Sequence, residues 1–270
     1  MKSSLTQTAP QQPLSKPPIT DRYRRIATWL IFLVVLIVCS IQTKVTPYQL
    51  IVGLPQMGSL LQEMFPPDWS YLPTVWGPMM ETIQIAIMGT TLGGLLAIPV
   101  ALLCAYNIMP NRWVSIPVRM VLNFVRTIPD LLFAAVFVAM FGIGPFAGML
   151  ALVFFSFGII AKLTYEAIEA IDPGPLEAMT AVGANRMQLI MFGVVPQALP
   201  YFVSYFLYTF EVNIRAAAVL GLVGAGGIGL LLDRALGLFR YDRASTIILL
   251  TLAIVLVIDY GSAMIRRKLL

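Results

Sequence analysis

Residues 223–229 read VGAGGIG, and three of these glycines have the spacing of a nucleotide-binding turn. Gly224, Gly226 and Gly229 satisfy G-x-G-x-x-G, and Asp242 follows 18 residues after Gly224. In a dinucleotide site such glycines let the backbone approach a pyrophosphate, and an acidic residue about 20 positions later binds the ribose. The pattern alone is weak, so the elements that hold these glycines must decide what they do.

A short polar cluster precedes the glycines. Glu211, Asn213 and Arg215 alternate with apolar residues. An arginine in such a place attracts an anion, and a carboxylate four residues earlier on a helix can pair with it. A role in binding substrate and a structural Glu211–Arg215 ion pair both remain open. For Asp259, in a later apolar run, we expect a structural pair with an arginine on the cytoplasmic side.

Composition decides which solvent the chain faces. Of the 270 residues, 59% are hydrophobic and 11% are charged, with a mean hydropathy of +0.84. Soluble domains carry roughly 25% charged residues, so this chain has too few of them to cover a water-facing surface. We therefore expect an all-α polytopic membrane protein with one membrane domain.

Charge and cysteine usage exclude several other classes. The net charge is +5, but the basic residues lie at the ends of apolar runs rather than in one patch, so no nucleic acid partner is expected. The sequence has no histidine, and Cys39 and Cys104 both lie within apolar runs. We expect both cysteines to pack in apolar surroundings, with no metal site and no disulfide.

The N-terminal part divides into two segments. Residues 1–20 are rich in Pro, Ser, Thr and Gln, which predicts a disordered cytoplasmic tail. An arginine cluster and an apolar run then predict an uncleaved signal anchor over 21–45. A cleaved signal peptide is the alternative, although Val38 is too large for the position before a lipoprotein cysteine.

Apolar run length predicts six membrane spans of about 20 residues each. They cover residues 26–42, about 80–106, about 127–144, about 146–165, about 193–213 and about 245–264. With the N-terminus in the cytoplasm, thirteen Lys and Arg residues lie in inside segments and five in outside segments, which favours this orientation. Residues 46–78 then form an external loop, 79–265 form the membrane core, and both termini are cytoplasmic.

Two local patterns refine the core. In 116–130, basic residues share one helical face and apolar residues another, which predicts a helix at the cytoplasmic surface that turns into the third span at Pro129. In the second span, small residues recur every four positions and would let another helix approach closely. This stripe consists of Gly89, Gly93, Ala97 and Ala101. Chance use of small residues on a lipid-facing helix is the alternative.

The cytoplasmic loop over 166–192 is the most informative stretch. The sequence Asp172-Pro-Gly-Pro breaks the incoming helix, and Pro175 suits a first helical turn. Gly183 can end the short helix in a left-handed conformation, and Asn185 can cap the next one. A short helix held between two breaks suits docking to a cytoplasmic partner, whereas the alternative is an ordinary connecting loop.

This loop resembles the EAA loop of bacterial ABC importer permeases. Glu177-Ala178 is followed by Gly183 and, thirteen residues later, by Pro196, as in the pattern E-A-A, x3, G, x9, I-x-L-P. The chain departs from the pattern at three positions: Met179, Gly193 and Val195 stand where the family pattern has Ala, Ile and Leu.

Three further segments narrow the resemblance to the permease subunit of phosphonate-type ABC importers. They read RTIPDLL (126–132), EVNIRAAAVLGLVGAGGIG (211–229) and IDYGSAMIRRKL (258–269). The similarity covers most of residues 70–270, and none of the first 50.

The resemblance implies a type I permease core like that of methionine importers, in the bacterial plasma membrane and surrounded by lipid. It implies a homodimer of this chain, a cytoplasmic ABC ATPase dimer and an external substrate-binding protein. No cofactor would bind this chain, and ATP and Mg²⁺ would be held by the ATPase, so the chain is not expected to be an enzyme. The residues implied for coupling to the ATPase are Pro175, Glu177, Ala178, Gly183 and Pro196. Those implied for the translocation path or gate are Arg126, Asp130, Glu211, Asn213, Arg215, Gly224, Gly226, Gly227 and Gly229.

The predicted topology places the glycine-rich stretch between the fifth and sixth spans, near the outer side. A dinucleotide turn belongs to a βαβ unit in water, and a phosphate-binding loop needs a Lys that is missing here. We therefore expect a bent or re-entrant segment at the external mouth of the path, because irregular backbone at membrane depth must be buried in protein or line a cavity. A flexible external loop is the alternative.

Two other functions remain open at this point. A stand-alone secondary carrier or channel would have no need of the short helix over 175–183, and we see no internal repeat of the kind that carriers often show. An ABC importer for another small solute, such as phosphite or methionine, is the second alternative, because the binding protein largely sets the substrate.

Overall fold

A computed structural model describes residues 19–44 and 47–269 of the chain. Most of the predicted tail, residues 1–18, lies outside the described residues. The described residues divide into two compact units between residues 60 and 61. The first unit contains α1 (Ile19–Thr43), which covers the predicted anchor and has exposed apolar side chains throughout its middle. The predicted loop over 46–78 includes a second helix, α2 (Pro47–Glu63), and a short 3₁₀ turn, η1 (Trp69–Tyr71).

The second unit is built on a pair of long helices, α3 (Leu72–Cys104) and α6 (Pro145–Glu169). The small-residue stripe of α3 faces α6, as the sequence predicts. A Cβ added to Gly89 would lie 2.5 Å from the Leu152 Cβ, and one added to Gly93 would lie 2.6 Å from the Ser156 Cβ. Both spacings are shorter than real contacts, so only glycine permits this approach of the two helices.

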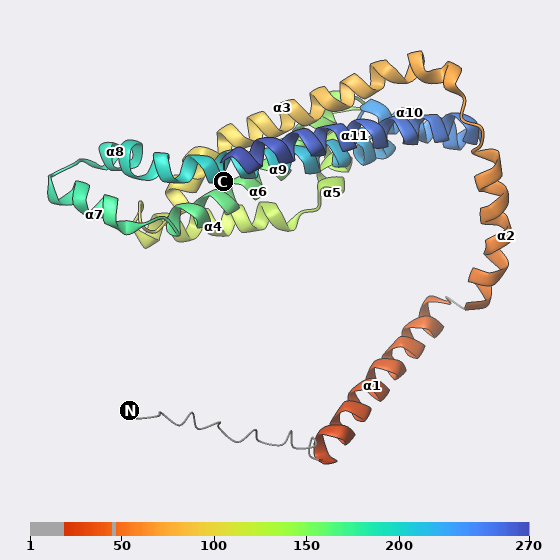
Figure 1. Ribbon diagram of the computed structural model, residues 1–270, viewed down its shortest axis with the longest axis horizontal. Coiled ribbons are helices and arrows are strands. Elements are labelled where there is room, and N and C mark those ends of the chain that lie inside the picture. The colour runs from red at the N-terminus through yellow and green to blue at the C-terminus, as the bar shows by residue number, and fades with distance from the viewer. Residues whose placement is uncertain (1–18, 45–46, 270) are drawn as a thin grey trace, which may run out of the picture. The chain divides into compact units, whose positions relative to one another are not determined.

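Two more long helices complete the bundle. Helix α9 (Val195–Leu220) packs against α3 and α6, and α11 (Tyr241–Leu269) packs against α9 (Figure 1). Their contacts bury apolar side chains in the second unit, including Leu152, Ile160 and Ile214.

A sharp bend at Pro129 precedes the helix of the third predicted span, as the sequence predicts. Helices α4 (Arg112–Thr127) and α5 (Asp130–Phe141) meet at an angle of 84° across Ile128 and Pro129. Among the described residues, five helices are long and apolar enough to cross a membrane, or six if this bent pair counts as one span. Proline at 129 explains the break, because it disfavours helical backbone in the residue before it.

Helix α4 has only two buried residues, Ser115 and Leu122, and it contacts the bundle along one side. It runs along α6, since Arg119 pairs with Glu169 near the end of α6, and the stem of Arg126 lies against Gly158. Helix α5 continues along α6, where Phe133 and Phe137 contact Phe154 with ring centroids 5.5 and 5.6 Å apart. The side of α5 that carries Phe133 and Phe137 therefore packs on α6, whereas Trp113, Met120 and Phe124 of α4 are exposed.

Short elements lie at the two ends of the second unit (Figure 1). At one end are α7 (Pro173–Ala181), α8 (Arg186–Gln188) and a π-helical segment, η2 (Leu189–Val194). At the opposite end are a 3₁₀ turn, η3 (Gly221–Val223), and α10 (Gly227–Gly237). The residues that the sequence singles out for coupling and the glycines that it singles out for gating thus lie at opposite ends of the bundle.

Candidate functional site

The predicted coupling loop is a helix between two stops. Asp172 caps α7 by accepting a hydrogen bond from the Gly174 N–H at 2.9 Å. Gly183 has a φ of +81°, the left-handed conformation that ends the helix. Asn185 and Gln188 then form a capping box that starts α8. The breaks predicted at Asp172 and Gly183 and the cap predicted at Asn185 are confirmed; the helix begins two residues earlier than 175.

The two faces of α7 differ in exposure. Pro175, Glu177 and Ala178 are exposed, and so is Gly183 after the helix ends. On the other face, Leu176 and Met179 are half-buried. The helix thus leaves its Glu177 side exposed and keeps its apolar side against the rest of the chain.

That apolar side rests on Gly193 in η2. A Cβ at Gly193 would lie 3.3 Å from the Met179 Sδ and 3.7 Å from Leu176. Pro196, the last residue of the predicted pattern, lies in the first turn of α9 immediately after η2. A proline has no N–H to donate, which is consistent with the change from π-helical to α-helical register just before it.

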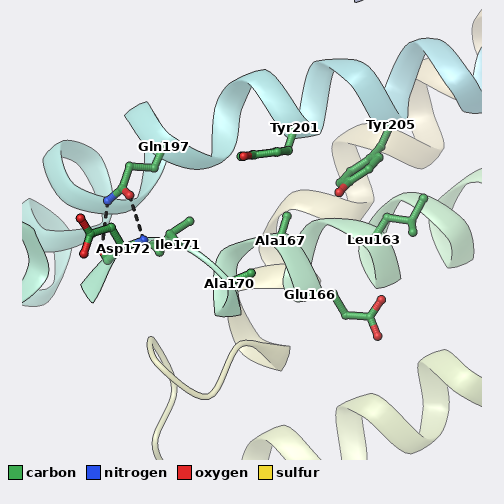
Figure 2. Close-up of a pocket in the computed structure, with 9 residues that line it drawn as sticks. All are labelled: Leu163, Glu166, Ala167, Ala170, Ile171, Asp172, Gln197, Tyr201 and Tyr205. Carbon is green, nitrogen blue, oxygen red and sulfur yellow. Dashed lines mark hydrogen bonds between the residues drawn. The ribbon is translucent and has the colours of Figure 1, made fainter. Parts of the chain in front are cut away.

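Sequence reasoning missed Gln197, which joins the beginning and the end of the coupling loop. Its Oε1 accepts a hydrogen bond from the Asp172 N–H at 3.1 Å, and its Nε2 donates to the Gly193 carbonyl at 2.9 Å. Figure 2 shows Gln197 and Asp172 at one end of a pocket of about 450 Å³, with Tyr201 and Tyr205 farther along α9. Only the structure reveals this clasp, because 25 residues separate its ends.

The glycine-rich stretch forms a buried bend at the opposite end. Gly224, Gly226 and Gly227 have φ values of +89°, +82° and +69°, which L side chains rarely adopt. The bend links η3 to α10, two helical segments, whereas a dinucleotide turn links a strand to a helix. Gly224 and residues 226–229 are all buried, so this stretch is packed backbone rather than a flexible external loop.

Helix α3 caps this bend. The Gly227 N–H donates to Glu81 Oε1 at 3.0 Å, and the Ile228 N–H donates to Thr82 Oγ1 at 2.7 Å. These amides lie in the first turn of α10, where no intrahelical acceptor exists, and a carboxylate there is favoured by the helix dipole. The sequence carried a signal for Glu81, namely a carboxylate inside an apolar run.

Removing the Thr82 hydroxyl tests this cap. Thr82→Val keeps the shape of a fully buried side chain but leaves the Ile228 N–H without its acceptor, so we expect a loss of about 1–3 kcal/mol of stability. The midpoint of thermal unfolding in detergent would measure it. Gln84→Ala, at an exposed position of the same helix, is the control and should leave the midpoint unchanged. Equal midpoints for Thr82→Val and wild type would contradict a structural role for the cap.

Two ion pairs join α9 to α11. Arg266 Nη2 donates to Glu211 Oε1 at 2.7 Å, and Arg215 Nη1 donates to Asp259 Oδ2 at 2.6 Å. The Glu211–Arg215 pair, one of the two alternatives that the sequence left open, is therefore not formed. Asp259 does form a structural pair, but its partner is Arg215 rather than an arginine assigned to the cytoplasmic side. Helical spacing identifies neighbours on one helix and cannot identify partners on another.

The remaining predicted path residues have different surroundings. Asn213 is fully buried, and its Nδ2 donates to Thr90 Oγ1 at 2.7 Å and to Ser156 Oγ at 2.6 Å. Asp130 starts α5, where its Oδ1 accepts from the Leu131 N–H at 2.9 Å. Arg126 is exposed and forms no ion pair with any of the described residues. The path residues thus lie at several levels of the bundle and make no single cluster.

Arg119 connects three helices at the end of the bundle that carries the coupling loop. The Arg119 guanidinium donates to the Cys104 carbonyl at 2.5 and 2.9 Å and pairs with Glu169. It also lies over the Tyr106 ring, with 3.6 Å from its Cζ to the centroid. Arg119 therefore fastens α4 to the ends of both α3 and α6, next to the coupling loop.

Known proteins share this architecture and much of the sequence. A family model described as the binding-protein-dependent transport system inner membrane component matches residues 97–270. The phosphite transport system permease protein PtxC of Stutzerimonas stutzeri is 37% identical, over 88% of this chain and 86% of the relative. The phosphate-import permease protein PhnE of Mycolicibacterium smegmatis is 34% identical, over 95% of this chain and 48% of the relative.

A solved structure supports the same fold. A chain of the inward-facing methionine ABC transporter MetNI superposes with a TM-score of 0.67 at 24% identity, covering 75% of this chain and 99% of that one. At this identity the likeness concerns the fold alone. Together with the family match, it confirms the predicted all-α permease core. The chain therefore belongs to the family of binding-protein-dependent transport system inner membrane components, as a permease of the phosphonate-type ABC importers.

Proposed function

We propose that this chain forms the translocation path of an ATP-driven importer for a phosphorus oxyanion, phosphonate or phosphite. The two relatives are permeases for phosphite and for phosphate, which supports this substrate class. The chain would work as a homodimer in the bacterial inner membrane, with both termini in the cytoplasm. A cytoplasmic ABC ATPase dimer would hydrolyse ATP, and an external binding protein would deliver the substrate.

The observation that carries the proposal is α7, a short capped helix with an exposed Glu177 side at one end of the bundle. In the proposed cycle this helix is seated in a groove of the ATPase. Closure of the ATPase dimer around ATP moves α7, and the bundle opens the path outward. Hydrolysis then resets the inward-facing state.

The charges of the bundle suggest where an oxyanion would be attracted. Asp259 neutralises Arg215, and Glu211 neutralises Arg266. Arg126 is exposed beside Gly158, and no described carboxylate pairs with it. We therefore assign Arg126 to the path as its attractive cation, and Arg215 to the structural pair with Asp259.

Reconstitution tests the function directly. Proteoliposomes would contain the chain, its ATPase and the binding protein, and ATP hydrolysis would be measured with phosphonate, phosphite, phosphate or methionine outside. We expect phosphonate or phosphite to stimulate hydrolysis and methionine to leave it at the basal rate. Stimulation by methionine alone, or solute uptake without any ATPase present, would overturn the proposal.

Gly183→Asp is the matched variant. A carboxylate side chain at a φ of +81° disturbs the end of α7, so the variant should lose both ATPase association in pull-downs and substrate stimulation. Gly261→Ala, in α11, is its control, because a Cβ there meets nothing within 4 Å. Retained ATPase binding by a folded Gly183→Asp variant would contradict docking through α7.

A further inference from the structure

The coupling helix is fastened to one of the two long helices that it connects. Its apolar side chains Met179 and Leu176 rest on Gly193, immediately before α9 begins. The Gln197 side chain, in the first turns of α9, donates to the Gly193 carbonyl and accepts from the Asp172 N–H. Every one of these contacts joins α7 or its cap to η2 and α9.

The connection to α6 is different. Helix α6 ends at Glu169, and a non-helical stretch over 170–172 follows before α7 begins. Between α6 and the inner part of α9 lies the pocket of about 450 Å³, whose far side is formed by Tyr201 and Tyr205 (Figure 2). The pocket opens beside one side of α6, while on the other side Ile168 packs with Val194 and Ala198. Helix α6 therefore contacts α9 directly, whereas the hydrogen bond of the Asp172 N–H and the contact of Met179 both go to η2 and α9.

The sizes of the residues at positions 179 and 193 are matched at their contact: the large Met179 lies against the small Gly193. At 3.3 Å from the Met179 Sδ, a Cβ at position 193 would already be crowded, and a larger side chain would push α7 away. These are also two of the three positions at which the loop departs from the EAA pattern, with a larger residue at one and a smaller one at the other. The two departures compensate each other at a single contact.

We propose, on the basis of the proposed function, that Met179, Gly193 and Gln197 are positioning residues that lock the coupling helix to α9. The ATPase then moves α7 and α9 as one body, and the chain bends at residues 170–172. The stroke reaches the bundle through α9, which carries Asn213 and the two arginine–carboxylate pairs.

A cross-link between α7 and η2 tests whether the coupling helix moves together with α9 or independently of it. Met179→Cys and Gly193→Cys would be combined in a chain whose Cys39 and Cys104 are replaced by serine and alanine, and joined by a short bifunctional thiol reagent. If α7 and α9 move together, the cross-linked importer should keep most of its substrate-stimulated ATP hydrolysis. Loss of stimulation on cross-linking, with recovery when a cleavable reagent is reduced, would overturn the proposal.

A size exchange provides the second test. Gly193→Ile alone should lower substrate-stimulated hydrolysis about tenfold, because the new side chain displaces Met179. Adding Met179→Ala should restore it, since the smaller residue makes room. The readout is the ratio of stimulated to basal hydrolysis, which a mere loss of folded protein leaves unchanged. If the double variant instead lost substrate stimulation by the combined amount of the two single variants, the proposed contact between Met179 and Gly193 would not position α7.

These outcomes are distinct from failure of the proposed function itself. Pull-down of the ATPase by the wild-type chain, and its stimulation by phosphonate or phosphite, test whether α7 is a coupling helix at all. The cross-link and the size exchange test which long helix α7 moves with. If the substrate stimulates the importer but the cross-link blocks it, the proposed function stands and the proposal that α7 moves together with α9 is wrong.

Discussion

Replacing Gly229 with alanine should reduce uptake to the background of cells without the importer. Gly229 lies in the first turn of α10, and a Cβ there would collide with the Ala218 carbonyl oxygen and lie 2.8 Å from the Gly221 Cα. Both obstacles are backbone, so no rotamer change can relieve them. Overpacking of this kind costs about 1–3 kcal/mol and separates the packed segments. The bend would then lose its position under the cap that Glu81 and Thr82 supply.

The experiment measures uptake of labelled phosphite against the amount of protein in the membrane. Gly237→Ala is a closely matched control, since it lies at the end of the same helix and a Cβ there meets nothing within 4 Å. We expect the control to transport at the wild-type rate. Normal uptake by Gly229→Ala at normal expression would refute close packing of the bend.

Replacing Glu211 with alanine should destabilise the bundle more than any other single removal of charge. The Glu211 side chain is 8% exposed and its partner Arg266 is 26% exposed. Removing one member of a buried pair leaves the other charge without compensation, at a cost of about 3–5 kcal/mol. We expect the midpoint of thermal unfolding to fall sharply and the chain to be recovered in lower yield.

Asp259→Ala gives the comparison within the same pair of helices. Its pair with Arg215 is more open to the surroundings, at 34% and 47% exposure, and exposed pairs contribute little. The midpoint should therefore fall much less than in Glu211→Ala. If the midpoint of thermal unfolding fell equally in both variants, burial would not determine how much each ion pair contributes to stability. A charge exchange, Glu211→Arg with Arg266→Glu, should recover part of the loss.

The sequence predicts the elements of this fold better than their contacts. Apolar run length places four of the long helices, and the spacing of Gly89 and Gly93 correctly predicts a close helix contact. The stops of α7 are also readable, because the residues Asp172, Gly183 and Asn185 act locally through their own backbone and neighbours. Each of these signals depends on residues a few positions apart.

Features that depend on distant residues could not be predicted in the same way. The partners of Glu211 and Arg215 lie 55 and 44 residues away. The cap on α10 comes from Glu81 and Thr82, 146 residues earlier. The contact of α4 with α6 could not be predicted for a related reason, since an apolar side chain such as Leu122 is equally suited to a protein neighbour and to lipid. Composition cannot distinguish a protein neighbour from a lipid interface.

The amide of Asn213 has a consequence for biogenesis. During synthesis α3 and α6 leave the ribosome before α9, and their glycine contacts let them pair in the bilayer first. The hydroxyls of Thr90 and Ser156 then lie on the surface of this helix pair as two hydrogen-bond acceptors. When α9 inserts, its Asn213 Nδ2 reaches both hydroxyls at one height and rotation of the helix. The side chain thus favours one register for the helix that carries it.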